Sequence, residues 1–599
     1  MKNLSFTLQT IFALCILSHA YSEDFTMDIS TSSIALTWEL YSIYPTEEEF
    51  NVDFEKVKEL LSKQKEELQE RILGSQEAGK LLRQLNAYVE CLVAQDTSDQ
   101  TAHVKTSEVS QWKAKYQGVL FSLGLQLAKL DDEEFQKFLR SDASLEEISF
   151  FLEELREHAQ IKGSQEQEEL VQGLISDGYH SFWSLYQTIT GKIQVGEKNL
   201  SIGQAENLLT DPDKEVREQA FDDWNKAWVK EVDLLAQLLN HIAGFRLGVY
   251  EMRGWSDPLF EPLFLNRMRK ETLDAMWKEV IRTKPILLKY LAHKAKLLGV
   301  EKLSWVDVEA PLYQTEEVPY SEACRTILEQ FHRFHPRKAA FAKMALEKRW
   351  VEAEDRAGKA AGGFCVMFPK SKESRIFMTY TGTASNVATL AHELGHAYHN
   401  ECLKDLPYFA QLAQMNVAET ASTFGEMVVI DQAIEQAKSS QEKQQLLDDK
   451  LQRSVAYFCN LHARLLFEEA FYQERKKGFV SAERLCRLME EAQKEAYGDS
   501  LSSYFPHFWA AKLHFYYTYF PFYNFPYTFG YLLSNGLYAR AKGGDFSNQF
   551  DAFLGDTALM SVEDLASKHL QVDLTKPDFW KESLDVIEKD VELFCQIGD

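Results

Sequence analysis

The sequence predicts a mainly α-helical protein of two or more lobes, with one small β-sheet beside its most polar motif. Three observations support this fold class. The chain has 599 residues, which is more than one hydrophobic core usually supports. Most of its length places apolar residues three and four positions apart, the spacing of an amphipathic helix. Residues 355–385 depart from this pattern and are rich in glycine, aromatic and β-branched residues.

The N-terminal part of the chain has the pattern of a helical bundle. From about Glu47 to Ile175, segments such as FEKVKELLSKQKEELQERI place apolar residues at helical spacing between charges. Residues 186–204 instead alternate apolar and polar positions, which predicts a short hairpin or loop between lobes. Helices resume afterwards, and we expect Asp211 to cap the first of them, with Pro212 at its first helical position.

A small β element is predicted shortly before the polar motif. Arg375–Tyr380 alternates well enough for a strand, and Phe364–Phe368 is expected to pair with it. From residue 386 to the C-terminus the pattern is again mostly helical. The predicted sheet therefore lies in an otherwise helical context.

Charge and cysteine content exclude several classes of function. The chain carries 65 Lys and Arg against 91 Asp and Glu, a net charge of −26, so phosphate backbones and anionic lipids repel it. We therefore exclude nucleic-acid binding and attachment to membrane surfaces. The 8 cysteines form no CxxC pair, which argues against a disulfide framework or a cysteine-based zinc site. It predicts mostly reduced, buried thiols.

The first twenty residues, MKNLSFTLQTIFALCILSHA, have the features of a weak secretory signal. They contain one Lys, an apolar stretch centred on Ile11–Leu17 and a Ser-His-Ala end, although polar residues interrupt the apolar run. Because the cysteine pattern favours a reducing compartment, we expect a cytoplasmic protein, with export through residues 1–20 as the alternative. No other segment approaches the ~20 apolar residues of a membrane span.

Residues 389–400, TLAHELGHAYHN, form the motif with the clearest chemical content. On a helix, His392 and His396 lie one turn apart on one face, so both imidazoles can point at one metal ion. Glu393 is offset by one position, where its carboxylate can reach a water on that metal. Ser385 or Asn386 is expected to cap this helix. The alternative is a half-buried polar helix whose histidines are satisfied by hydrogen bonds.

A catalytic zinc site also needs a third protein ligand. A metzincin would have glycine at 399 and histidine at 402, whereas this chain has His399 and Cys402. The remaining common choice is a glutamate on a second helix, and QMNVAETASTFGEMVVI at 414–430 offers Glu419 and Glu426. Their apolar neighbours indicate a buried helix, where a carboxylate needs a partner. The residues alone leave open which glutamate is the ligand.

A tyrosine-rich segment follows, HFYYTYFPFYNFPYTFGYLLSNGLY at 514–538. Its prolines stop a helix from running through it, so we expect Tyr523 on a loop and Tyr527 in the first turn of a new helix. Aromatic stretches are usually core, but buried tyrosine hydroxyls need partners. Together with His514, these hydroxyls are donors that suit the stabilisation of a developing oxyanion in a hydrolase.

These three stretches resemble the thimet-oligopeptidase family of zinc metallopeptidases (family M3), and specifically its oligoendopeptidase F branch. The segment GGFCVMFPKSKESRIFMTYTGTASNVATLAHELGHAYH is similar to the signature block of that family, and VAETASTFGE is similar to its third-ligand helix. The tyrosine-rich segment resembles its substrate-contacting segment. LTWELYSIYP at 36–45 resembles the usual start of these proteins, so the similarity extends from about residue 36 to the C-terminus.

The resemblance implies a fold and a site. The fold would be two helical lobes around a deep substrate channel, with a small sheet beside a thermolysin-like HExxH zinc site. One Zn²⁺ per chain would be bound there, and Glu393 would be the general base. Gly362 and Gly363, with strand 375–380, would let a peptide lie alongside as an added strand. The implied ligands are His392, His396 and Glu419, and the positions that contact substrate or stabilise the transition state are His514, Tyr523 and Tyr527.

The resemblance also implies an activity and a division of the chain. The activity would be a metalloendopeptidase acting on oligopeptides; a related zinc carboxypeptidase or peptidyl-dipeptidase that trims C-termini is the alternative. A non-catalytic helical binding protein with a degenerate metal site is a third hypothesis. We expect a signal-like or extra segment at 1–26, an N-terminal helical domain at 27–200 and a catalytic domain at 201–599. Neither the sequence nor the resemblance sets an oligomeric state.

Overall fold

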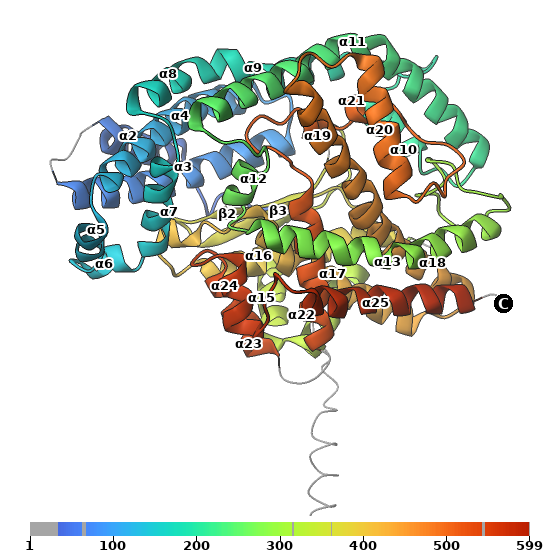
Figure 1. Ribbon diagram of the computed structural model, residues 1–599. Coiled ribbons are helices and arrows are strands. Elements are labelled where there is room, and N and C mark those ends of the chain that lie inside the picture. Colours follow the sequence, from blue (N-terminus) through green and yellow to red (C-terminus); the bar gives the residue numbers. More distant parts are fainter. Residues whose placement is uncertain (1–33, 63–66, 314–316, 361, 542–545, 598–599) are drawn as a thin grey trace, which may run out of the picture.

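The computed structural model describes residues 34–62, 67–313, 317–360, 362–541 and 546–597. Within these ranges the chain is mainly helical and contains one three-stranded sheet (Figure 1). Its buried apolar residues form two separate hydrophobic cores. The predicted fold class, mainly α with a small sheet, is therefore confirmed.

The smaller core belongs to the N-terminal helices, drawn in blue at the left of Figure 1. Its residues run from Trp38 to Leu152, and a few side chains from later in the chain, such as Phe368 and Phe409, join them. The helices predicted from Glu47 to Ile175 are present, and those up to Gln160 form the predicted bundle, whereas the last one, Gln165–Ile175, packs with the larger core. The helices of the bundle are α2 (Glu47–Ser62), α3 (Leu68–Gln95), α4 (Gln100–Ala128), α5 (Asp132–Leu139), α6 (Ala143–Glu146) and α7 (Ser149–Gln160).

The larger core runs from Tyr179 to Cys595 and contains the motifs singled out in the sequence. Its first elements are α8 (Gln165–Ile175), the π-helix η1 (Ser176–His180), α9 (Ser181–Thr190), α10 (Ile202–Leu208), α11 (Lys214–Arg253), α12 (Phe260–Leu265), α13 (Lys270–Leu297), α14 (Tyr320–Phe334) and α15 (Pro336–Glu347). After the sheet follow α16 (Ala384–Leu403), the 3-10 helix η2 (Tyr408–Gln411), α17 (Met415–Gln436), α18 (Ser440–Val455), the π-helix η3 (Ala456–Asn460), α19 (Leu461–Arg475) and α20 (Ala482–Ala496). The last elements are α21 (Phe508–Ala511), the 3-10 helix η4 (Leu513–Phe515), α22 (Phe525–Ala541), α23 (Ser547–Asp556), α24 (Val562–Leu570) and α25 (Pro577–Gln596).

The sheet lies between the two cores. Its strands are β1 (Val351–Glu352), β2 (Phe364–Phe368) and β3 (Glu373–Phe377), in the order β1-β3-β2. The predicted pairing of Phe364–Phe368 with the next strand is confirmed, and the structure shows that it is antiparallel, with Phe364 of β2 opposite Phe377 of β3. Because side chains alternate across a strand, Ile376 joins the larger core and Phe377 the smaller one. The strand predicted at 375–380 in fact begins and ends earlier, and the two-residue β1 was too short to show a pattern.

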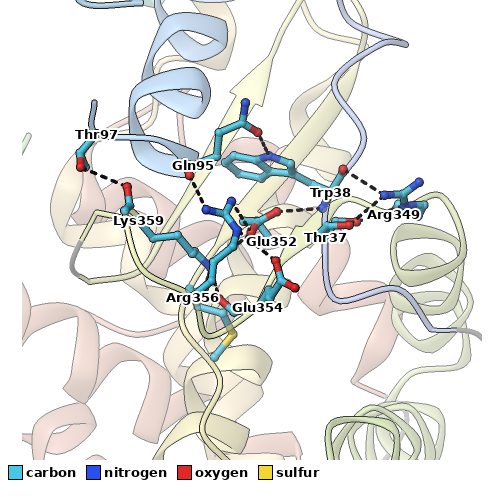
Figure 2. A network of polar contacts seen from close by, with 11 residues as sticks. Thr37, Trp38, Gln95, Thr97, Arg349, Glu352, Glu354, Arg356 and Lys359 are labelled. Carbon is cyan, nitrogen blue, oxygen red and sulfur yellow. Dashed lines mark hydrogen bonds and ion pairs between the residues drawn. The ribbon is translucent and has the colours of Figure 1, made fainter. Parts of the chain in front are cut away.

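A polar network fixes the chain that leads from β1 to β2 (Figure 2). The Glu352 side chain is buried; it accepts a hydrogen bond from the Trp38 backbone N–H at 3.2 Å and pairs with Lys359 at 3.4 Å. Arg356 bonds Glu352 at 3.2 Å and donates to the backbone oxygen of Gln95 at 2.7 Å. A buried carboxylate held by two cations and a backbone donor is fully compensated. The network ties the N-terminal bundle to the segment that precedes β2.

Two helix caps differ from the sequence-based prediction. Asp213, rather than Asp211, caps α11 by accepting from the Glu215 N–H at 2.9 Å. Asp211 instead accepts from the Asp213 N–H at 2.8 Å and closes the preceding turn. At α16 the cap is Thr383, so the predictions of Ser385 and Asn386 were wrong. Asn386 is the third residue of a capping box with Thr383.

The predicted hairpin at 186–204 is partly correct. Its first residues belong to the end of α9, which continues to Thr190. The turn that follows closes with an antiparallel bridge between Val195 and Leu200, as expected for a short hairpin. The helix extends further than predicted because Tyr186 is buried in the larger core, and tertiary burial overrides the local alternation.

Glycines let the two helices of the polar motifs approach closely. A Cβ atom at Gly395 of α16 would lie 2.5 Å from both the Ala421 oxygen and the Ser422 Cα of α17. In the reverse direction, a Cβ at Gly425 of α17 would lie 2.9 Å from the Ala391 oxygen of α16. The backbones are thus in contact at two places that any side chain would separate.

A similar contact joins α17 to α22. A Cβ atom at Gly530 would lie 2.9 Å from the Asn416 oxygen and 3.0 Å from the Glu419 Cβ. Helices α16, α17 and α22 therefore form one layered unit with α17 at its centre. Residues that project from these three helices are held at fixed separations by backbone contact rather than by flexible side chains.

Two sequence-based expectations concern the N-terminus and membranes. The signal-like segment 1–26 lies outside the described residues and stays a prediction. In the part of the chain that the structure describes, no helix combines the length and the apolar character needed to cross a bilayer.

The contact at Gly395 predicts a large effect of a single methyl group. The Gly395→Ala variant should be destabilised by about 1–3 kcal/mol, because backbone atoms of α17 cannot move aside as a side chain could. Gly118→Ala on α4 is the matched control, since nothing lies within 4 Å of its Cβ. That change should stabilise the protein by about 0.5–1 kcal/mol through helix propensity. Urea unfolding midpoints measure both, and equal midpoints for the two variants would contradict the close contact.

Candidate metal centre

His392 and His396 project from neighbouring turns of α16 toward the same point. Their Nε2 atoms lie 3.0 Å apart. From α17, Glu419 Oε2 lies 3.3 Å from His392 Nε2 and 3.5 Å from His396 Nε2. The helix repeat stacks the two imidazoles, and the α16–α17 contact at Gly395 brings the carboxylate alongside them.

These separations fit a bound metal ion. Ligands about 2.0–2.1 Å from a tetrahedral zinc lie roughly 3.3 Å from one another, and the three observed separations, 3.0, 3.3 and 3.5 Å, bracket that value. Two imidazole nitrogens and a carboxylate oxygen facing one another are mostly acceptors, so a cation satisfies all three at once. The donor set therefore fits zinc.

Glu426 occupies a different position from Glu419. Its carboxylate accepts a hydrogen bond from His392 Nδ1, and its other oxygen pairs with Arg453 of α18. A proton held at Nδ1 leaves Nε2 of His392 as the lone-pair atom that faces the cluster. Of the two glutamates that the sequence left open, Glu419 thus joins the cluster, and Glu426 orients one of its histidines.

Glu393 lies beside this cluster and is buried. Its side chain is 5% exposed, and its Oε2 atom has no hydrogen-bond partner. Burial raises the pKa of its carboxyl to about 7, with a smaller contribution from the negative charge of Glu419 and an opposing one from His392. On the neighbouring β2 side, a Cβ at Gly363 would lie 3.4 Å from Glu393 Oε1. A buried carboxylate oxygen without a partner is uncommon in a folded protein and marks Glu393 as a candidate functional group.

The histidine and tyrosines of the third motif come together around α22. The rings of His514 and Tyr523 are stacked with centroids 5.2 Å apart, and the ring of Tyr527 lies 5.5 Å from that of Tyr523. Tyr523 lies on a loop and Tyr527 in the first turn of α22, as predicted. Tyr527 is one turn before Gly530, the residue that contacts Glu419, so these rings lie on the α22 side of the cluster.

Burial determines the protonation of these groups. It lowers the pKa of His514 to about 3, with help from the charges of Arg464 and Lys512, so the imidazole is neutral at neutral pH. Its Nδ1 atom has no partner. Burial likewise raises the pKa of Tyr527, which is hydrogen-bonded to Tyr523. These side chains are therefore neutral donors.

Sequence reasoning missed Arg453 and Tyr457, which no motif marks. Arg453 forms an ion pair with Glu426. Tyr457 lies on the π-helix η3; burial raises the pKa of its hydroxyl, and the negative charge of the nearby Glu419 raises it further. π-turns within helices are frequent at functional sites, but this one, between α18 and α19, could not be recognised in the sequence.

The expected role of strand 375–380 as an edge for a bound peptide was wrong, because β3 is paired on both sides. An added strand would have to pair with an outer strand of the sheet, β1 or β2.

Comparison with known proteins identifies the family. Residues 207–584 match the profile of Peptidase family M3, more than half of the chain. The chain belongs to peptidase family M3. It is therefore a metallopeptidase, and the expected branch is confirmed too, since residues 126–194 match the profile named Oligopeptidase F.

Relatives of this family M3 chain are similar over nearly its whole length. Oligopeptidase PepF of Bacillus subtilis is 23% identical, covering 92% of this chain and 87% of its own length. Oligoendopeptidase F (chromosomal) of Lactococcus lactis subsp. cremoris is 22% identical, covering 93% of this chain and 96% of its own length. Among solved structures, a Chlamydophila abortus protein matches with a TM-score of 0.80 and 18% identity, covering 95% of this chain and 99% of that one. Oligoendopeptidase-F of Enterococcus faecium matches with a TM-score of 0.67 and 20% identity, covering 93% of this chain and 99% of that one. The structures share the fold.

The different positions of the two glutamates predict different losses of metal. Glu419→Ala should abolish stoichiometric metal binding, because it removes a cluster atom. Glu426→Ala should weaken binding by about 10–100-fold, because it releases only the orientation of His392. Glu401→Ala, on the same helix as the histidines but paired with Lys404, is the control and should keep full binding. Metal content after dialysis and competition with a chromophoric chelator measure both effects. A greater loss of metal from Glu426→Ala than from Glu419→Ala would show that Glu426 is the ligand and Glu419 the orienting residue.

Proposed function

We propose that this chain is a zinc-dependent metalloendopeptidase that hydrolyses internal peptide bonds of oligopeptides. The observation that carries the proposal is the convergence of three ligand atoms beside the buried, unpartnered carboxylate of Glu393. The names of the relatives support the substrate class, since they include oligopeptidases and oligoendopeptidases. The family expectation of zinc agrees with the nitrogen and oxygen donor set.

His392, His396 and Glu419 would hold the zinc ion. Bound there, it would polarise the scissile carbonyl and acidify water. Glu393 would take the proton from the attacking water and pass it to the leaving amine. Burial raises the pKa of this carboxyl from its ordinary value toward neutral pH, which suits a group that first takes up and then returns a proton.

The donors on the α22 side would bind the oxygen on which negative charge develops. Tyr523 and Tyr527 share a hydrogen bond, so one hydroxyl can rotate toward substrate while the other supports it. His514 contributes a neutral ring stacked on Tyr523. A donor of this kind is typically worth about 3–4 kcal/mol in the transition state.

The proposed domain division follows the same evidence. We propose an N-terminal helical domain at 27–200 and a catalytic domain at 201–599. The N-terminal residues of the smaller core end at Leu152, and the larger core begins at Tyr179, so residues 179–200 of the proposed N-terminal domain pack with the larger core. The Oligopeptidase F profile ends at 194, and the Peptidase family M3 profile begins at 207. A channel between the lobes would admit extended peptides and exclude folded proteins.

One observation favours the alternative, a related enzyme that trims peptide C-termini. Such an enzyme needs a cation to hold the terminal carboxylate. Arg464 and Lys512 lie over the ring of Phe508, at 5.3 and 5.6 Å from its centroid, and their charges reach His514. Lys512 is also 3.6 Å from Glu206, which neutralises part of this charge. The endopeptidase therefore remains the leading proposal.

A peptide blocked at both ends separates the two activities and tests the general base. We expect the wild type to cleave an internally quenched peptide with acetylated and amidated termini. Glu393→Gln should retain zinc but lose turnover by about 10²–10⁴-fold, because the proton acceptor is gone.

Glu401→Gln on the same helix is the matched control and should retain full activity. Normal turnover by Glu393→Gln would show that Glu393 is not the general base. Cleavage confined to peptides with a free C-terminus would favour the trimming enzyme instead.

A further inference from the structure

A set of aromatic side chains continues outward from Tyr523. The ring of Tyr523 lies 5.5 Å from that of Tyr517 and 6.1 Å from that of Phe520. Tyr517 in turn lies 5.2 Å from Trp183 and 5.6 Å from Tyr519. Centroid separations of this size are those of interacting aromatic pairs. The rings therefore form a connected series that starts at the proposed oxyanion donors.

The series ends on a second π-helix. Tyr519 stacks on His180 of η1, with centroids 4.3 Å apart and ring planes 11° from parallel. Single π-turns within helices are frequent at functional sites. We call His180, Trp183, Tyr517, Tyr519 and Phe520 the aromatic rim.

The outer members of the aromatic rim are exposed. Tyr519 is 56% and Phe520 40% exposed, although both are large and aromatic. Trp183 and Tyr517 are half-buried. Single exposed apolar residues need no explanation, but a connected exposed group beside a binding site is typical of a surface that contacts a ligand.

Buried polar contacts hold the aromatic rim in place. Arg246, which is 5% exposed, donates to the backbone oxygen of Tyr517 at 2.9 Å and to the hydroxyl of Tyr472 at 3.0 Å. The buried Thr518 hydroxyl lies 2.8 Å from His180 Nδ1. The loop is thus fixed from below while its rings face outward, so little conformational entropy is lost when a ligand binds them.

The aromatic rim is also uncharged. Burial and the charge of Arg246 lower the pKa of His180, so this imidazole is neutral at neutral pH. The other four members are Trp, Tyr and Phe. The surface therefore favours an apolar group with a π-face over a charged one.

Spacing relates the aromatic rim to a bound peptide. An extended peptide advances about 3.3 Å per residue, and adjacent rings of the series are 4.3–6.1 Å apart. Tyr519 is reached from Tyr523 through Tyr517 in two steps of 5.5 and 5.6 Å, so it lies at most about three residues of extended peptide from Tyr523. Tyr523 is hydrogen-bonded to Tyr527, whose pKa is influenced by the charge of Glu419 in the metal cluster. A peptide whose scissile bond lies at the cluster can therefore place a side chain a few residues away against these rings.

We propose that the aromatic rim is a substrate subsite that binds one large aromatic side chain of the peptide, a few residues from the scissile bond. This proposal rests on the proposed peptidase function and adds to it a preference for peptides that carry an aromatic residue at that position. The subsite acts through binding, and its residues take no part in the chemical step.

The test measures binding in the Glu393→Gln protein, so that peptides stay intact. The probes are fluorescein-labelled decapeptides of alanine and serine with one phenylalanine, placed at each position in turn. Fluorescence anisotropy should show one or two positions at which phenylalanine tightens binding about tenfold over the parent peptide, the effect expected of a new aromatic contact.

Two double variants are compared in that background. Tyr519→Ala/Phe520→Ala should reduce the tenfold preference to about one. Tyr41→Ala/Phe479→Ala, which removes the same two residue types at sites 69% and 53% exposed, should keep it. Circular dichroism and melting temperature should be alike for both.

Three results would overturn the subsite: no phenylalanine position gains affinity, the gain survives Tyr519→Ala/Phe520→Ala, or leucine or proline at that position gives an equal gain. Cleavage of the same peptides by the protein with Glu393 intact is scored separately. A phenylalanine preference in binding without any cleavage would contradict the proposed function and leave the subsite standing.

Discussion

Backbone contact between three helices is the constraint on which the site depends. Gly395 and Gly425 allow α16 and α17 to touch, and Gly530 does the same for α17 and α22. Because the cluster residues project from α16 and α17, their separations are set by this contact. Interiors packed at crystal-like density transmit small displacements, so a methyl group at the interface would move the ligand atoms by an amount that matters to a metal ion.

The charges and protonation states of the surrounding groups also shape the site. The cluster brings together three atoms that accept hydrogen bonds, so a bound cation would satisfy them. Glu426 and Arg453 fix the proton of His392 on the far nitrogen, while burial raises the pKa of Glu393 and keeps His514 neutral.

Much of this could be predicted from sequence because it is local. The helical bundle, the β2–β3 pairing and the loop position of Tyr523 follow from spacing over a few residues. The choice between Glu419 and Glu426 could not be derived from residues alone, because both lie on one face of α17 and only the position of α16 distinguishes them. The caps at Thr383 and Asp213 were missed by two residues, since several adjacent side chains are able to cap. Arg453, Tyr457 and the aromatic rim were missed because contacts between distant segments leave no periodic pattern.

The most direct test of the account is anomalous diffraction at the zinc absorption edge from crystals of active protein. We expect one peak about 2.0–2.2 Å from His392 Nε2, His396 Nε2 and a carboxylate oxygen of Glu419. An active protein with no peak at that point, or with its metal held by other residues, would contradict the account.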